Sequence, residues 1–164
     1  MRGLSFIAGG ELYAVDVTLV EKVARKLAIT PVPSAPYEVI GIANLKGRVV
    51  TIMSLIRLLG IDEGKSDELN LNSIVFKSGS GGDNQLGLAV EKPGNLIDIT
   101  DDAVRMPNVT TGTEESFCIS GVTEIDDKFY RIIDIEAIQR KYSHGVEAIS
   151  GNSSYGGTEN EQII

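Results

Sequence analysis

Few side chains in this sequence of 164 residues could act as a nucleophile, a general base or a soft metal ligand. His144 is the single histidine, and it lies in a stretch of Gly, Ser, Asn and Glu, where an exposed side chain is favoured over a catalytic base. Cys118 is the single cysteine, and its apolar surroundings favour a small buried hydrophobe over a reactive thiol. A zinc site would need more ligands of this kind. The sequence therefore predicts no catalytic residue, no metal site and no cofactor.

Carboxylates that could perform acid–base chemistry or hold a cation gather at Asp98–Asp102 and at Asp126–Asp127. Both groups lie at predicted turns, where aspartate is favoured because it hydrogen-bonds the local backbone. The segment Asp62–Asp67 lacks the ligand spacing of an EF-hand loop, and Gly64–Ser66 lacks the upstream glycine of a phosphate-binding loop. These motifs favour turns and connections, so the chain is not predicted to be an enzyme.

The net charge of −8 argues against binding to nucleic acid or to an anionic membrane surface, unless the chain has a local basic patch. No such patch is evident in the sequence. The longest apolar runs are far shorter than the roughly 20 residues of a membrane-spanning helix, so no membrane insertion is expected. The N-terminal residues lack the features of a secretory signal, and the single cysteine cannot form an internal disulfide. A cytoplasmic location is predicted.

A stretch of about twenty residues, Ile40–Leu59, occurs twice without a gap, and its second copy begins at Ser120. Gly41 corresponds to Gly121, and the turn Lys46–Gly47 corresponds to Asp126–Asp127. Each copy predicts two strands around a tight turn, followed by a short helical turn. Further equivalent positions are Val49 and Phe129, Ile52 and Ile132, Leu55 and Ile135, and the helix caps Ser54 and Asp134.

The repeat extends beyond this stretch. A hairpin is predicted from Leu4 to Val17 around Gly9–Gly10, and a second one from Asn72 to Glu91 around the glycine-rich loop 78–84. Val15 then corresponds to Leu88. Three prolines between Ile29 and Tyr37 predict an extended crossing, because proline lacks an amide donor.

Short strands separated by Gly and Pro predict an all-β fold, and the small size of the repeat favours two five-stranded β-barrel subdomains packed side by side, with short helical turns. We expect one domain over 1–142, with subdomain one mainly 15–71 and subdomain two mainly 72–135, and with terminal segments possibly exchanged between them. Residues 143–164 are predicted to be a flexible tail. Two barrels side by side also predict an apolar groove between them.

The order of these segments resembles the CheW family, the coupling proteins of bacterial chemotaxis. The resemblance runs from about residue 4 to 140 and is most specific over Pro33–Leu55, where family members typically show P-x-x-P, then GV-x-NLRG, then a DL pair. It implies two SH3-like five-stranded barrels. It also implies an adaptor that binds the regulatory domain of a CheA-type histidine kinase and the cytoplasmic tip of methyl-accepting chemoreceptors.

Eight positions match the partner-binding motifs of that family. They are Val20, Lys22 and Val23 in V-x-E-V, and Gly41, Asn44, Leu45, Lys46 and Gly47 in G…NLRG. Alternatives stay open for most of them: the two glycines could serve only a strand bend and a turn, the two valines could be core, and the two lysines could be a solvated face.

The sequence departs from the family pattern at five positions, and two of them are the candidate lysines. Lys46 replaces the arginine of NLRG, and Lys22 replaces the glutamate of V-x-E-V, with Glu21 just before it. Because charge complementarity selects partners, two further functions remain open. One is a divergent adaptor of a non-flagellar pathway, and the other is a regulatory domain that binds a small ligand in the groove.

Overall fold

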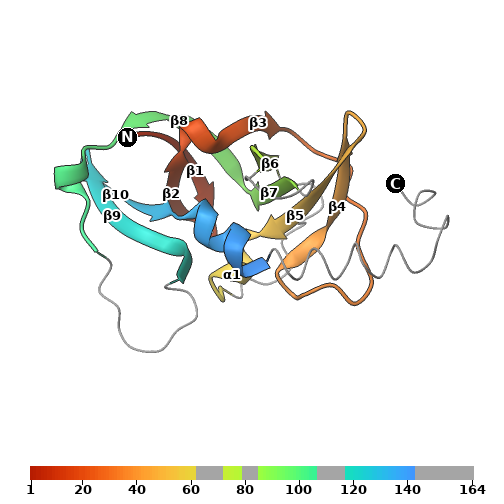
Figure 1. Cartoon of the computed structure of the whole chain (residues 1–164). Helices are drawn as coiled ribbons and strands as arrows, with labels where there is room; N and C mark the ends of the chain where they lie inside the picture. The colour runs from red at the N-terminus through yellow and green to blue at the C-terminus, as the bar shows by residue number, and fades with distance from the viewer. Residues whose placement is uncertain (62–71, 79–84, 107–116, 143–164) are drawn as a thin grey trace.

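A computed structural model describes residues 1–61, 72–78, 85–106 and 117–142 of the chain, and the predicted tail 143–164 lies outside them. The described residues form two five-stranded β-sheets with a few short helices, which confirms the predicted all-β fold (Figure 1). The strands are β1 (Arg2–Ala8), β2 (Glu11–Asp16), β3 (Val20–Ala24), β4 (Val39–Leu45), β5 (Arg48–Ser54), β6 (Asn72–Phe76), β7 (Gln85–Val90), β8 (Lys92–Asp98), β9 (Ile119–Ile125) and β10 (Lys128–Ile133). The helices are η1 (Val17–Leu19), α1 (Leu55–Leu58), η3 (Asp101–Ala103) and a last helix over 135–142.

Each sheet takes strands from both halves of the chain. One sheet has the order β8-β1-β2-β10-β9, and the other has the order β3-β6-β7-β5-β4. The sheets therefore do not follow the expected subdomain limits of 15–71 and 72–135, because β6 pairs with β3 and β7 pairs with β5. In the same way β1 and β2 pair with β8 and β10. Each repeat thus contributes its first hairpin to one sheet and its last three strands to the other.

The repeat is reproduced in the strand register. Gly41 pairs with Ile52 in the β4–β5 hairpin, and Gly121 pairs with Ile132 in the β9–β10 hairpin. Both hairpins are irregular at the same place, just before Gly41 and Gly121. Ser54 and Asp134 cap the helices that follow, since their side chains accept hydrogen bonds from backbone amides three residues ahead.

Both hairpins also close with the same tight turn. Lys46 and Gly47 have φ angles of 52° and 81°, and Asp126 and Asp127 have φ angles of 52° and 62°. Positive φ at both central residues defines the turn whose twist matches that of two antiparallel strands. The turn geometry is therefore shared, although the side chains differ completely in charge.

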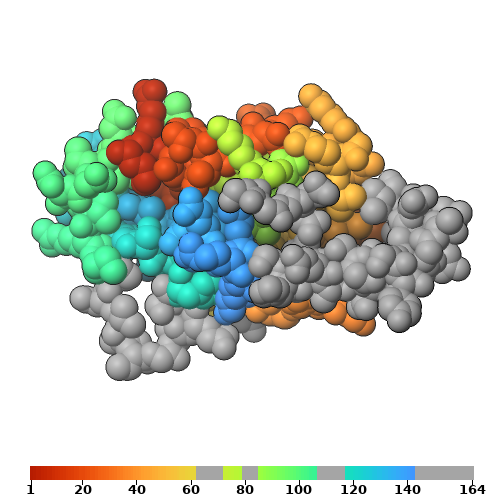
Figure 2. Space-filling view, viewed as in Figure 1, coloured from red at the N-terminus to blue at the C-terminus, as the bar shows by residue number. Residues whose placement is uncertain are grey.

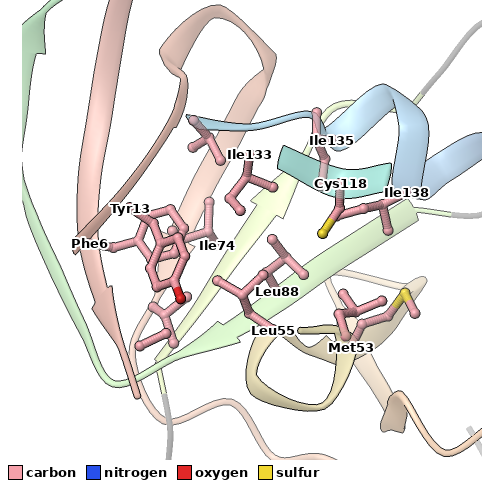
Figure 3. Packing of buried hydrophobic residues seen from close by; sticks show 14 of the residues in the cluster. Phe6, Tyr13, Met53, Leu55, Ile74, Leu88, Cys118, Ile133, Ile135 and Ile138 are labelled. Atoms are coloured by element: carbon pink, nitrogen blue, oxygen red, sulfur yellow. The ribbon is translucent and has the colours of Figure 1, made fainter. Parts of the chain in front are cut away.

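The largest hydrophobic cluster among the described residues is shared by the two sheets. Its largest fully buried side chains come from both sheets and include Tyr13 of β2 and Leu88 of β7 (Figure 3). The last helix contributes Ile135 and Ile138, and Cys118 is fully buried in the same cluster. The apolar side chains between the sheets are therefore packed inside the protein and do not line an open groove.

Candidate partner-binding surface

Strand β3 positions the first three candidate residues in two different ways. Val20 and Val23 are half-buried and pack against the shared core, whereas the side chain of Lys22 is exposed. The register between β3 and β6 shifts between Val20 and Lys22, so Glu21 is the extra residue of a β-bulge. The two valines thus hold β3 on the core, and Lys22 is available to a partner.

Glu21 ties β3 to the β4–β5 hairpin. Its carboxylate forms a salt bridge with Arg48 at an N–O distance of 3.0 Å and accepts a hydrogen bond from the amide of Gln85. The same amide donates to the backbone carbonyl of Phe76 at 3.1 Å, which fixes the Gln85 side chain within the sheet. The hydrogen bond from Gln85, followed by those from Arg48, lowers the pKa of Glu21 below its usual value. Two segments that are far apart in the sequence are thereby joined at the surface.

The lowered pKa predicts a pH dependence of stability. A carboxylate with a depressed folded-state pKa stabilises the protein above its ordinary value of 4.5, and the contribution is lost as the pH falls through the folded-state pKa. At neutral pH, Glu21→Gln is expected to melt at a lower temperature than the wild type, and the difference should vanish at the most acidic pH. Thermal unfolding of both proteins over a pH series measures it. Glu124→Gln, at an exposed carboxylate of β9 without a salt bridge among the described residues, is the control; a difference that persists in acid would contradict the assignment.

Gly41 has a structural reason to be glycine. A Cβ atom at this position would lie 2.2 Å from the carbonyl oxygen of Thr30 and 2.7 Å from its carbon. This close approach lets Thr30 and Ile42 exchange two backbone hydrogen bonds of 2.8 and 2.9 Å. Gly41 is itself buried, as is Leu45, so neither candidate presents a side chain to solvent.

The hairpin turn presents the remaining three candidates. The side-chain oxygen of Asn44 accepts a hydrogen bond of 2.9 Å from the backbone amide of Gly47 and thereby stabilises the turn. Lys46 is exposed at the tip. Of the eight candidates, Lys22 and Lys46 are therefore the long side chains that a partner could reach, and the Glu21–Arg48 salt bridge brings their strands together.

These segments create a basic surface that the sequence analysis did not anticipate. We call it the cationic edge and define it by five exposed side chains of β3, its C-terminal extension and the hairpin: Lys22, Arg25, Lys26, Lys46 and Arg48. Figure 2 shows the hairpin projecting beside β3 on one side of the molecule. The sequence did not reveal that these cations share one part of the fold, because the Glu21–Arg48 salt bridge joins their two segments only in the folded chain.

The sequence analysis missed Arg48, Gln85 and the two cations after β3, although one signal was present. Residues 1–61 contain seven Lys and Arg against four Asp and Glu, while the whole chain contains 15 against 23. The net charge of the whole chain is negative because the charged residues after 61 are mostly acidic, so it does not reveal the basic character of residues 1–61. A count of charged residues over separate segments points to residues 1–61, but it does not show which side chains lie close together in the fold.

The carboxylates that could perform chemistry lie at the end of a strand, in a short helix and in a turn. Asp98 to Asp102 end β8 and form η3, Asp126 and Asp127 form a turn, and His144 lies outside the described residues. Within the described ranges, no three His, Cys, Asp or Glu side chains are grouped so that they could hold a metal ion. In the same ranges, no helix is both long enough and apolar enough to span a membrane.

Comparisons with known proteins match nearly all of the described residues to one protein family. The CheW-like domain family matches residues 2–142. The chemotaxis protein CheW of Thermotoga maritima is 30% identical over 135 residues, covering 82% of this chain and 85% of that protein. The CheW of Treponema pallidum is 26% identical over 138 residues, covering 82% and 79% of the two chains. The crystal structure of the scaffolding protein TtCheW from Thermoanaerobacter tengcongensis superposes with a TM-score of 0.69 at 29% identity, covering 81% of this chain and 88% of that one.

Proposed function

Because this chain belongs to the CheW-like domain family, it is a chemotaxis signal-transduction scaffold, and we propose that it couples a CheA-type histidine kinase to the cytoplasmic tips of methyl-accepting chemoreceptors. The kinase contact would be made through the regulatory domain of the kinase. The protein acts in the cytoplasm by binding alone, without a catalysed reaction. The small-ligand alternative is not favoured, since the named relatives are chemotaxis proteins and a scaffolding protein.

One structural observation carries the proposal. The two segments that match the family's partner-binding motifs, β3 and the β4–β5 turn, are joined by the Glu21–Arg48 salt bridge, and Lys22 and Lys46 are exposed on them. A surface whose two segments are already joined needs less ordering on binding. We assign the receptor contact to this surface. The remaining candidates support it: Val20, Val23, Gly41 and Leu45 hold the backbone, while Asn44 and Gly47 shape the turn.

Coupling then follows from simultaneous binding. A scaffold that holds receptor and kinase together raises the effective concentration of each for the other. If the receptor-bound state favours one kinase conformation, the difference in binding free energy is transmitted to the kinase. Co-sedimentation of the purified chain with a kinase regulatory domain and a receptor cytoplasmic fragment tests this proposal. A ternary complex is expected, and failure of the chain to bind either partner would overturn it.

Lys46→Glu is expected to weaken receptor binding on the order of tenfold while leaving the fold intact, because it reverses an exposed charge at the tip of the surface. The fold should tolerate an acidic residue there, since Asp126 occupies the equivalent position with the same φ of 52°. Binding is measured by titration against the receptor fragment, and folding by circular dichroism. Lys128→Glu makes the same charge change on the other hairpin and should bind like the wild type; equal binding by Lys46→Glu would refute the assignment of Lys46.

A further inference from the structure

Gln85 is a polar side chain buried beneath the candidate surface. It lies on β7, is 2% exposed and pairs with Val50 of β5. Its amide nitrogen donates one hydrogen bond to the Glu21 carboxylate and another, of 3.1 Å, to the backbone carbonyl of Phe76. Because both neighbours are acceptors, only the amide nitrogen can face them. Glu21 is therefore held from the interior by a side chain that a partner cannot reach.

This arrangement leaves the side-chain oxygen of Gln85 buried and without a hydrogen-bond partner in the described part of the chain. An unpaired buried acceptor destabilises a fold, so its presence needs an explanation. In the repeat, Leu88 of the same strand is equivalent to Val15 of β2. The counterpart of Gln85 on β2 is therefore the apolar Leu12. Since the fold accepts an apolar side chain at this place, packing alone does not explain the glutamine.

The contact of Gln85 supports the bulge of β3. Glu21 is the extra residue of that bulge, and its second carboxylate oxygen binds Arg48 of the hairpin. In the other sheet the edge strand β8 has a shifted register as well, and there Ser5 exchanges hydrogen bonds of 3.0 and 2.9 Å with the backbone of Asn95. That irregularity is held within the β1–β8 pair. The contact made by Gln85, in contrast, continues through Glu21 to the hairpin.

From these contacts we propose that Gln85 is a positioning residue for partner binding, which holds Glu21 so that β3 and the β4–β5 hairpin are presented as one surface. This inference rests on the proposed function, which assigns the receptor contact to that surface. It adds a buried residue that touches no partner and acts through Glu21. Because β7 belongs to the second repeat, the second repeat thereby shapes a surface that the first repeat exposes.

Gln85→Leu removes both hydrogen bonds and introduces the residue type of the counterpart Leu12. The variant should melt within about 3 °C of the wild type, because loss of the hydrogen bonds is offset by removal of the unpaired oxygen. Its binding to the receptor fragment should weaken on the order of tenfold, since the two segments must then be ordered on binding. Titration of the full chain against the fragment measures the loss, and binding equal to that of the wild type would overturn the proposal.

Thr123→Val is the matched control. The hydroxyl of Thr123 is also buried and has no hydrogen-bond partner among residues that the structure describes, but it lies on β9 of the other sheet. The variant should bind the receptor fragment like the wild type. An equal loss of binding in Thr123→Val would overturn the proposal, because any change inside the protein would then suffice.

An NMR titration of the Glu21 carboxyl group reports on the contact without any partner. The hydrogen bond from Gln85 is the largest cause that holds the pKa of Glu21 below its usual value of 4.5. In Gln85→Leu this pKa should therefore move up towards 4.5, because the charged carboxylate loses a donor. An unchanged pKa would show that Gln85 serves packing only, and the proposal would be wrong.

A double-mutant cycle tests whether Gln85 acts through Glu21. Glu21→Ala and Gln85→Leu should each weaken receptor binding, and the double variant should bind within about twofold of Glu21→Ala alone. Losses that multiply would contradict the proposal, because Gln85 would then affect binding by another route.

The same measurements separate this inference from the proposed function. If the wild type binds the receptor fragment and Gln85→Leu binds it equally well, the inference is wrong and the scaffold function stands. If the wild type binds neither the receptor fragment nor the kinase regulatory domain, the proposed function fails and this inference fails with it. The NMR titration distinguishes the two cases, since it establishes the contact between Gln85 and Glu21 independently of any partner.

Discussion

Gly41→Ala is expected to lose about 3 kcal/mol of unfolding free energy, since the new Cβ would collide with main-chain atoms that cannot rotate away. The carbonyl oxygen of Thr30 would lie 2.2 Å from it. To relieve that contact, the crossing segment must move away from β4 and give up its paired hydrogen bonds with Ile42. Denaturant unfolding of the wild type and the variant measures the loss.

Gly121→Ala is the matched control, because Gly121 holds the equivalent place in the other hairpin. There the nearest atom to an added Cβ is the side-chain Cγ1 of Val104 at 2.4 Å, and the nearest main-chain atom, the Arg105 oxygen, is 3.2 Å away. A valine side chain can shift more readily than a backbone, so a smaller loss is expected. A Gly41→Ala protein that is as stable as the wild type yet fails to bind the receptor would instead show direct partner contact at Gly41.

Leu88→Ala is expected to cost about 3 kcal/mol and to lower the stability of both sheets together. Leu88 is fully buried in the cluster that the two sheets share, so the cavity would open between them. One cooperative transition should remain, at a lower temperature, because the largest hydrophobic cluster contains side chains of both sheets. Calorimetry tests this through the agreement of calorimetric and van't Hoff enthalpies.

Ile52→Ala provides the comparison within one sheet. Ile52 is equally buried, but it belongs to a smaller cluster. That cluster is made by strands β4, β5, β6 and β7 of one sheet, with Leu27 and Ile29 packed against it. If the sheets fold as one unit, this variant should also shift the single transition as a whole. Two separate transitions, of which Ile52→Ala moves only one, would show that the sheets unfold independently.

Substitutions at the candidate residues can weaken partner binding either by damaging the fold or by removing a contact. Four of the eight candidate residues, namely Val20, Val23, Gly41 and Leu45, are held by packing or by close backbone approach. Loss of partner binding on substituting them would follow from damage to the scaffold. Lys22 and Lys46 are exposed, so loss of binding at those positions would report contact.

Features that depend only on neighbouring residues could be predicted from the amino-acid sequence. The duplicated hairpin, its tight turn and the caps at Ser54 and Asp134 are local, and each is present in the structure at the expected residues. The all-β fold followed from the same signals, because strand length and turn spacing are set over a few residues. The repeat of Gly41 at Gly121 was visible for the same reason.

Strand pairing and the contacts between distant charged residues depend on the packing of the whole chain. Strands β6 and β7 of the second repeat pair with β3 and β5 of the first repeat, and this pairing depends on contacts between distant segments. Because the two repeats are similar, the strand edges of either repeat could accept the same hairpin. The joining of Glu21, Arg48 and Gln85 depends on that choice, and so does the cationic edge. Local sequence cannot specify such long-range choices, because they are made by the burial of a core shared by both sheets.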